Sequence, residues 1–144
     1  GTLEGQVLDD NTRELLSGSN YVHVATLMPD GSPHSVAMWG GVEGDRVIIF
    51  TGSPSSRKAR NLAADGRVAM SVTDHRNPYR TAQLRGRVAE TRHGAEALAA
   101  MDELSDKYTG EPFPWRSEEG TLYLIDVDWS RFAELPFTHA PAQG

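Results

Sequence analysis

The densest group of positive charge in the chain lies in the segment TGSPSSRKARNLAAD, residues 51–65. Three cationic side chains, Arg57, Lys58 and Arg60, fall within four positions there, although the formal net charge of the chain is -6. An ordinary solvated face of a helix would explain such a group, and so would a site for an anionic ligand such as phosphate if the neighbouring residues also suit it.

The residues just before these cations favour the start of a helix. Ser53 and Ser55 are good N-cap residues, and Pro54 suits the first helical turn. The start of a helix offers free backbone N–H groups and the positive end of the helix dipole. Together with the serine hydroxyls and the three cations, this start provides the chemistry of a phosphate site.

The helical geometry separates the three cations. At roughly 100° of rotation per residue, Arg57, Arg60 and Asn61 share one face of the helix. Lys58 lies within about 40° of Leu62 and so borders the apolar side. Arg57 and Arg60 could therefore also belong to an ordinary solvated face of the helix. Of the three cations, Lys58 is the one whose position a solvated face explains least.

Other kinds of site are not supported. The pattern GxxxxGK[ST] is absent, which argues against hydrolysis of nucleoside triphosphates. The five histidines (23, 34, 75, 93 and 139) lack metal-ligand spacing. Ser35 and Ser71 fall in expected strands without the context of a nucleophile elbow. No acid–base pair stands out among the residues, an absence that is compatible with chemistry supplied by a cofactor.

Length and composition set the general class. A chain of 144 residues suits a single domain over residues 1–144, and 38% apolar with 24% charged residues is typical of a soluble globular protein. The absence of cysteine excludes disulfides and thiolate metal sites, and we expect a cytoplasmic protein. No apolar run approaches about 18 residues, and no secretory pattern opens the sequence. A pI of about 5.3 argues against nucleic acid as a partner.

The elements that must position the cations follow from hydrophobic periodicity. A short helix is expected from a capping box at Asn11 to a stop at Gly18, and a longer one over 94–108. Six strands are expected, joined mainly by hairpins: 21–28, 32–42, 46–52, 67–73, 79–91 and 121–127. Several of them are apolar on both faces, which predicts a mainly β (α+β) fold, a small antiparallel barrel covered by helices or by a second subunit.

Three stretches carry a family resemblance: ATLMPDGSPHSVAMW, RVIIFTGSPSSRKARNLAADGRVAMSVTD and YRTAQLRGRVAE. From about Tyr21 to Val127 the chain resembles the pyridoxamine 5'-phosphate oxidase-like FMN-binding split barrels. Within them it looks most like the actinobacterial flavin/deazaflavin oxidoreductases that use coenzyme F-420, and the segment KYTGEPFPWR (107–116) is similar to members of that branch.

The resemblance implies a six-stranded split β-barrel that forms a homodimer with two cofactors at the interface. By position, the cofactor phosphate would contact Thr51, Ser56, Lys58 and Asn61, supported by Arg57 or Arg60. The ring would lie against Ala37, Met38, Trp39 and Phe50. F-420 also carries a glutamate tail, for which Arg57, Arg60, Arg76 and Arg80 are the available cations.

The implied function is a reductase that transfers hydride from reduced F-420 to a small unsaturated organic substrate, without a membrane or nucleic-acid partner. Two alternatives remain open: an FMN-dependent oxidase or reductase of the same superfamily, and an F-420-binding or storage protein without turnover. Loops 74–80 and 109–117 are expected to line the substrate pocket, with Tyr79, Arg80 or His75 as a donor.

Overall fold

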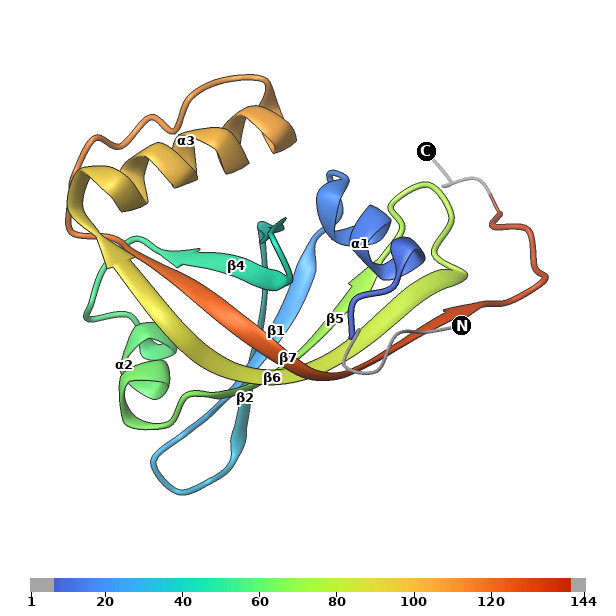
Figure 1. Ribbon diagram of the computed structural model, residues 1–144, viewed down its shortest axis with the longest axis horizontal. Coiled ribbons are helices and arrows are strands. Elements are labelled where there is room, and N and C mark those ends of the chain that lie inside the picture. The colour runs from blue at the N-terminus through green and yellow to red at the C-terminus, as the bar shows by residue number, and fades with distance from the viewer. Residues whose placement is uncertain (1–6, 141–144) are drawn as a thin grey trace.

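The computed structural model describes residues 7–140 and arranges them as a strongly curved antiparallel sheet of seven strands with three helices (Figure 1). The helices are α1 (Asp10–Ser17), α2 (Arg57–Ala64) and α3 (Gly94–Thr109). The strands are β1 (Val22–Leu27), β2 (Pro33–Met38), β3 (Gly40–Glu43), β4 (Arg46–Thr51), β5 (Arg67–Thr73), β6 (Arg80–His93) and β7 (Thr121–Glu134). The expected mainly β class with accessory helices is confirmed.

The two outermost strands of the sheet follow each other directly in the chain. The strand order is β2-β1-β5-β6-β7-β4-β3, and only Trp39 separates the end of β2 from the start of β3. The sheet must therefore curl until its two edges meet at this residue, which makes a barrel that is closed at one point and split elsewhere. The expected single strand over 32–42 is wrong for this reason, and the strands number seven instead of six.

β6 and β7 form the long curved ribbon that carries the rest of the sheet (Figure 1). Each has 14 residues, and their register shifts at Arg85/Gly86 and at Val88/Glu90. A Cβ atom at Gly86 would lie 2.0 Å from the carbonyl oxygen of Asp126, so this close crossing requires glycine. β7 runs to Glu134 and not to 127 as expected, because residues 128–134 pair with β6 although they are mostly exposed.

The curved sheet has a core on each side of β4 and β7. One cluster fills the barrel interior and includes Val24, Ile49 and Ile125. The other lies between the sheet and α3 and includes Phe50 and Met101. The apolar stripe expected in the helix over 94–108 is confirmed, since its leucines and Met101 are buried.

The starts of the two short helices differ from the expectation. Asp9 caps α1 and accepts from the N–H of Thr12, in place of the capping box expected at Asn11. Ser56 caps α2 and accepts from the N–H of Ala59, so α2 begins after the Ser-Pro-Ser-Ser turn. Gly18 ends α1 as expected.

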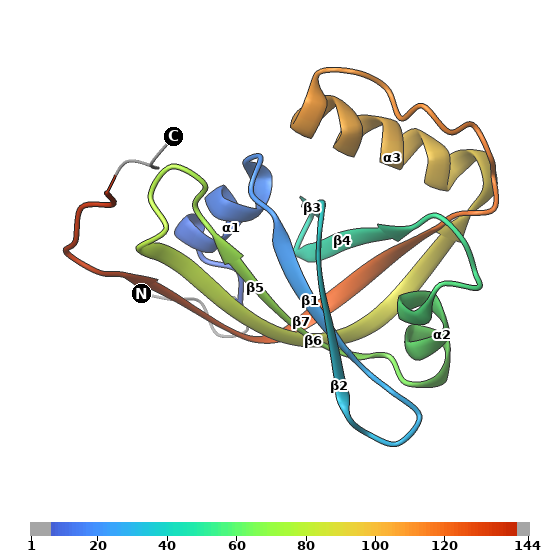
Figure 2. The same ribbon diagram turned by 180° about the vertical axis from the view of Figure 1, so that it is seen from behind.

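α1 and α2 lie at opposite ends of the barrel (Figures 1 and 2). α1 packs most closely against β3 and also contacts β5, β6 and β7, whereas α2 packs against β1. The loop that carries the cations therefore borders the end of the barrel where β1 turns into β2.

Candidate cofactor site

The loop between β4 and α2 is ordered by its own serines. The hydroxyls of Ser53 and Ser55 lie 2.9 Å apart, and the backbone N–H of Ser55 donates to Ser53 Oγ over 3.2 Å. Ser56 Oγ accepts from the N–H of Ala59 over 3.1 Å. The loop thus holds serine hydroxyls beside the first turn of α2, and a helix start is a place where an anion can bind.

Lys58 is a half-buried cation that has no counter-charge in the described part of the chain. Burial lowers the pKa of its ammonium group, and within residues 7–140 no carboxylate or hydrogen-bond acceptor opposes that effect. By contrast, seven of the twelve arginines lie within ion-pair distance of a carboxylate: Arg13, Arg46, Arg67, Arg80, Arg87, Arg92 and Arg116. Partial burial of an unpaired ammonium costs free energy, and a bound anion would remove that cost.

Arg57, Arg60 and Asn61 line one pocket, in agreement with the single helical face assigned to them. The pocket has a volume of about 330 Å³ and lies between α2 and the β1–β2 turn, with Met28 and Arg67 on its other walls. Lys58 is not among its lining residues. The adjacent cations of the sequence therefore have different surroundings in the fold.

Asn61 is 2% exposed, and its amide is engaged by the barrel. Asn61 Nδ2 donates to Thr26 Oγ1 over 3.0 Å and to the sulfur of Met28 over 3.5 Å, and Asn61 Oδ1 accepts from Arg57 Nη1 over 3.4 Å. This residue fixes α2 on β1 and orients Arg57.

Thr51 ends β4 just before the serine turn, and it carries an unsatisfied polar atom. The residue is 1% exposed, and its Oγ1 is buried without a hydrogen-bond partner among the described residues. A buried hydroxyl without a partner costs free energy. A polar group at the β4–α2 loop would therefore fit this position, and the residues around the loop fit a phosphate.

The residues expected against the cofactor ring come from two places. Met38 packs against the barrel core at the end of the edge strand β2. Trp39 stacks on Tyr108 of α3, with ring centroids 5.3 Å apart and planes 6° from parallel. Phe50 is 8% exposed and packs edge-on against Phe113, at 6.0 Å between centroids.

The loop 110–120 follows α3 and approaches Phe50, and contacts to Asp102 of α3 hold it in place. Asp102 accepts from the N–H of Phe113 over 3.0 Å and from Arg116 Nη1 over 2.7 Å. Trp115 packs edge-on against Phe113 and is 69% exposed. Of the two loops expected to line a substrate pocket, this one borders the β4–α2 loop within a single chain.

The other loop expected to line a substrate pocket, 74–80, does not border the β4–α2 loop within a single chain. It lies at the end of β5 away from α2, next to α1 (Figure 2). Arg80 is already paired there with Asp74 at 2.9 Å and with Glu134 at 3.4 Å. Tyr79 packs against Phe137, and the backbone N–H of His75 donates to Asn20. Within one chain, Arg76 and Arg80 are therefore separated from the cations of α2.

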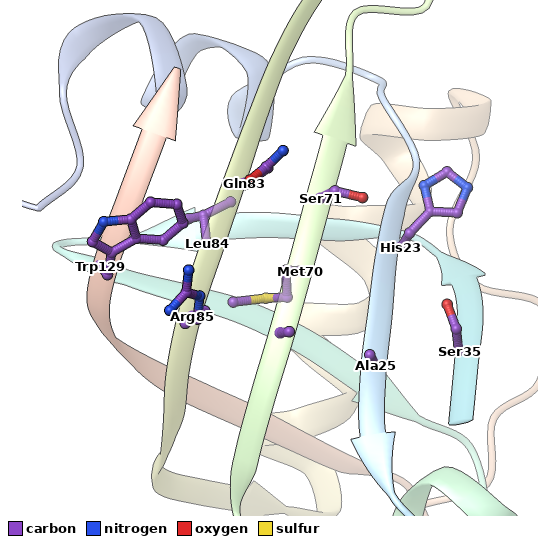
Figure 3. Close-up of a pocket in the computed structure, with 10 residues that line it drawn as sticks. His23, Ala25, Ser35, Met70, Ser71, Gln83, Leu84, Arg85 and Trp129 are labelled. Atoms are coloured by element: carbon purple, nitrogen blue, oxygen red, sulfur yellow. The ribbon is translucent and has the colours of Figure 1, made fainter. Parts of the chain in front are cut away.

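Sequence reasoning missed a shallow pocket on the outer face of β1, β5 and β6 (Figure 3). Its volume is about 250 Å³, and small side chains such as Ala25, Ala69 and Ser71 form its floor. The guanidinium of Arg85 lies over the ring of Trp129, 4.2 Å from the centroid, at one side. The alternation of small residues with buried valines along β1 and β5 is the signal that could have indicated this face.

Residues 7–140 contain neither a metal-binding cluster nor a membrane-spanning helix. No cluster of three or more His, Cys, Asp or Glu side chains is arranged to hold a metal ion in this part of the chain. None of the described helices is long and apolar enough to cross a membrane.

Comparison with known proteins agrees with the geometry. Residues 8–132 match the family model described as pyridoxamine 5'-phosphate oxidase. A structure titled F420 Reductase is 31% identical, with a TM-score of 0.72 and coverage of 83% of this chain and 94% of its own. No curated protein matches.

Two more distant structures share the fold. The conserved hypothetical protein Rv2991 from Mycobacterium tuberculosis is 23% identical, with a TM-score of 0.75 and coverage of 100% of this chain and 98% of its own. A heme binding protein from Mycobacterium smegmatis is 20% identical, with a TM-score of 0.64 and coverage of 85% of this chain and 51% of its own. The family match spans most of the chain, and the chain belongs to the pyridoxamine 5'-phosphate oxidase family.

Proposed function

We propose that this protein is an oxidoreductase that transfers hydride from the reduced deazaflavin coenzyme F-420 to a small unsaturated organic substrate. The observation that carries the proposal is Lys58, a half-buried cation that has no counter-charge within residues 7–140 and lies beside a serine-rich helix start. The similarity to the structure titled F420 Reductase favours the deazaflavin over FMN.

In this proposal the β4–α2 loop binds the cofactor phosphate. Lys58 supplies the charge, the serine hydroxyls and the N–H groups at the start of α2 supply donors, and Thr51 supplies the hydroxyl that lacks a partner. A charge-assisted hydrogen bond to phosphate is about twice as strong as a neutral one. Arg57 and Arg60 add positive charge on the neighbouring face of the helix.

The ring would lie between the edge strand β2 and the end of β4. β2 is the last strand of the sheet, so its outer backbone groups are free to bond a heterocycle. Met38, Trp39 and Phe50 supply apolar surface at that end, and Tyr108 holds Trp39 in place by stacking on its ring.

The reduced cofactor supplies the hydride, and the protein supplies binding and orientation. Phe50 and Phe113 exclude water from the end of β4, and Trp115 offers an exposed aromatic face beside them. No side chain is assigned as a proton donor. Within a single chain, His75, Tyr79 and Arg80 belong to the opposite end of the barrel from the phosphate loop.

The active form proposed is a homodimer with a cofactor at each side of the interface. The outer face of β1, β5 and β6 supports this arrangement because small side chains such as Ala25, Ala69 and Ser71 form the floor of a shallow depression there (Figure 3). A partner on this face would also bring a second set of loops to each cofactor, including residues 74–80.

The runner-up is an FMN-dependent oxidase or reductase, which the family match itself favours. Both cofactors carry a phosphate, so the β4–α2 loop does not separate them. A protein purified with bound FMN is yellow, whereas the F-420 proposal predicts a colourless protein that binds added F-420.

Fluorescence titration with F-420 and with FMN, followed by anaerobic oxidation of reduced F-420 over a substrate panel, tests the proposal. We expect saturable binding of F-420 and turnover with at least one substrate. Absence of saturable F-420 binding would contradict the proposal. Binding without any oxidation across the panel would instead support a storage protein.

A further inference from the structure

Lysine is rare in this chain, and both of its lysines are half-buried. Lys58 and Lys107 stand beside twelve arginines. Burial lowers the pKa of both ammonium groups. A lysine with a lowered pKa is more often the neutral amine, which is the nucleophilic form of the side chain.

The two amines differ in their hydrogen bonds. Lys107 lies in the last turn of α3 and donates to the carbonyl oxygens of Leu16 over 3.0 Å and of Gly40 over 2.6 Å. Two acceptors therefore engage its protons. Lys58 has neither a hydrogen-bond acceptor nor a carboxylate partner within residues 7–140, and its side chain is only partly buried. Of the two, Lys58 is the amine that a reagent can approach without breaking a bond to this part of the chain.

Lys58 also lies where a phosphate would bind. It is the second residue of α2 after the N-cap Ser56, in the turn whose N–H groups have no partner within the helix. Because Cα–Cβ bonds tilt toward the start of a helix, the side chain of Lys58 leaves α2 toward the serine turn. Thr51 leads into the same turn, is 1% exposed, and has an Oγ1 without a partner among the described residues. The loop thus combines donors for a phosphate with a nucleophilic amine.

We propose that Lys58 is an acylation site and that its acyl donor is an acyl phosphate bound through its phosphate at the β4–α2 loop. The amine of Lys58 attacks the acyl carbon and a C–N bond forms. The C–O bond to the phosphate breaks, inorganic phosphate leaves, and the proton released from the nitrogen passes to solvent. Binding at the helix start holds the acyl carbon beside the amine, and this proximity raises the rate.

The product is a neutral amide, so acylation removes the charge that the loop offers to an anion. The amide avoids the cost of a half-buried ammonium without a partner, but it forms no charge-assisted hydrogen bond. The modification therefore closes the anion site. Only this consequence rests on the proposed function, in which the anion is the phosphate of the cofactor.

The first test uses acetyl phosphate and needs no cofactor. The wild-type protein is treated at mildly alkaline pH with acetyl phosphate or with acetic anhydride, which carries no phosphate, and mass spectrometry measures acetylation of Lys58 and Lys107. We expect the ratio of Lys58 to Lys107 acetylation to be about tenfold higher with acetyl phosphate. Added inorganic phosphate should remove this difference. The same ratio with both reagents would overturn the inference.

A pair of threonine variants tests the position of the phosphate. Thr51→Val keeps the shape of the side chain and removes the hydroxyl without a partner, so it should lower the preference of acetyl phosphate for Lys58. Thr12→Val is the matched control, because Thr12 is also buried with an unpartnered Oγ1 among the described residues but lies on α1, at the opposite end of the barrel. An unchanged preference in Thr51→Val would contradict binding of the phosphate at this loop.

Titration with F-420 separates this inference from the proposed function. Protein acetylated at Lys58 should bind F-420 about ten- to a hundredfold more weakly than the untreated protein, and bound F-420 should protect Lys58. Selective acetylation of Lys58 in a protein that binds no F-420 would support the acylation site and contradict the proposed function. Binding of F-420 without selective acetylation of Lys58 would contradict the acylation site and leave the proposed function intact.

Discussion

Asn61 of α2 donates a hydrogen bond from Nδ2 to Oγ1 of Thr26 on β1, over 3.0 Å and with both residues 2% exposed. This contact joins the helix that carries the cations to the strand that forms the barrel. It also means that the helix start is positioned by a buried polar pair and not only by the apolar contacts of Leu62.

Replacing Asn61 with Ala should destabilise the protein by about 1–3 kcal/mol, because the hydroxyl of Thr26 would stay buried without its partner. Urea unfolding measures the change. Asn11→Ala, at an exposed position of α1, is the matched control and should cost under about 0.5 kcal/mol. Equal stability of the two variants would show that the Asn61–Thr26 bond does not hold the helix.

Ser56→Ala should cost about 1 kcal/mol, because Ser56 is the residue whose hydroxyl caps α2. Ser53→Ala should have a smaller effect, since Ser53 bonds only within the turn. Urea unfolding of both variants checks the assignment of the cap. A larger loss of stability for Ser53→Ala than for Ser56→Ala would contradict Ser56 as the N-cap and would favour Ser53, as expected from the sequence.

The cap shows where sequence reasoning reached its limit. It predicted a helix start with serine hydroxyls and separated Lys58 from Arg57 and Arg60 by rotation alone, and the fold agrees. It expected Ser53 or Ser55 as the N-cap, whereas Ser56 is the cap, because the position of the cap depends on how the turn leaves β4.

The other differences between the expected and the observed strands arise from strand pairing between distant parts of the chain. The strand breaks at Trp39 because the two edges of the sheet meet there. The amino acids of residues 32–42 give no local sign of this break. Residues 128–134 look like a tail because most of them are polar and exposed, yet β6 is long enough to pair with them and Phe132 packs against the core. Burial of Lys58 followed from periodicity, whereas the hydrogen bond from Asn61 to Thr26 required the fold.

Lys107→Met should destabilise the protein by about 1–3 kcal/mol near neutral pH. The ammonium of Lys107 donates to the carbonyl oxygens of Leu16 over 3.0 Å and of Gly40 over 2.6 Å, so it ties α3 to α1 and to β3. Methionine would leave both carbonyls without this donor. Chemical denaturation of the wild type and the variant gives the difference, and a variant as stable as the wild type would contradict it.

The same lysine predicts a pH dependence. Burial lowers the pKa of Lys107 to about 8, whereas the unfolded chain keeps the ordinary value of 10.5. Between these values the unfolded state binds more protons than the folded state, so the free energy of unfolding contributed by this group rises with pH. The stability of the wild type relative to Lys107→Met should therefore increase from pH 8 to pH 10, and a decrease over that range would contradict the assignment.

Asp102→Asn should loosen the loop 110–120. Asparagine keeps an acceptor for the N–H of Phe113 but loses the charge that pairs with Arg116, and this pairing holds the pKa of Asp102 below its usual range. We expect trypsin to cleave after Arg116 several times faster than in the wild type. Glu103→Gln, on the exposed side of the same helix, is the control, and equal cleavage rates in both variants would contradict the role of Asp102.

The central claim is that Lys58 binds the phosphate of the cofactor. Titration of F-420 into the wild type and Lys58→Ala, with fluorescence as the signal, tests it most directly. Loss of a charge-assisted contact of about 1.5–3 kcal/mol predicts an affinity lower by about ten- to a hundredfold, while Arg76→Ala should bind like the wild type. Affinity of Lys58→Ala within about twofold of the wild type, with its fold intact by circular dichroism, would contradict the account.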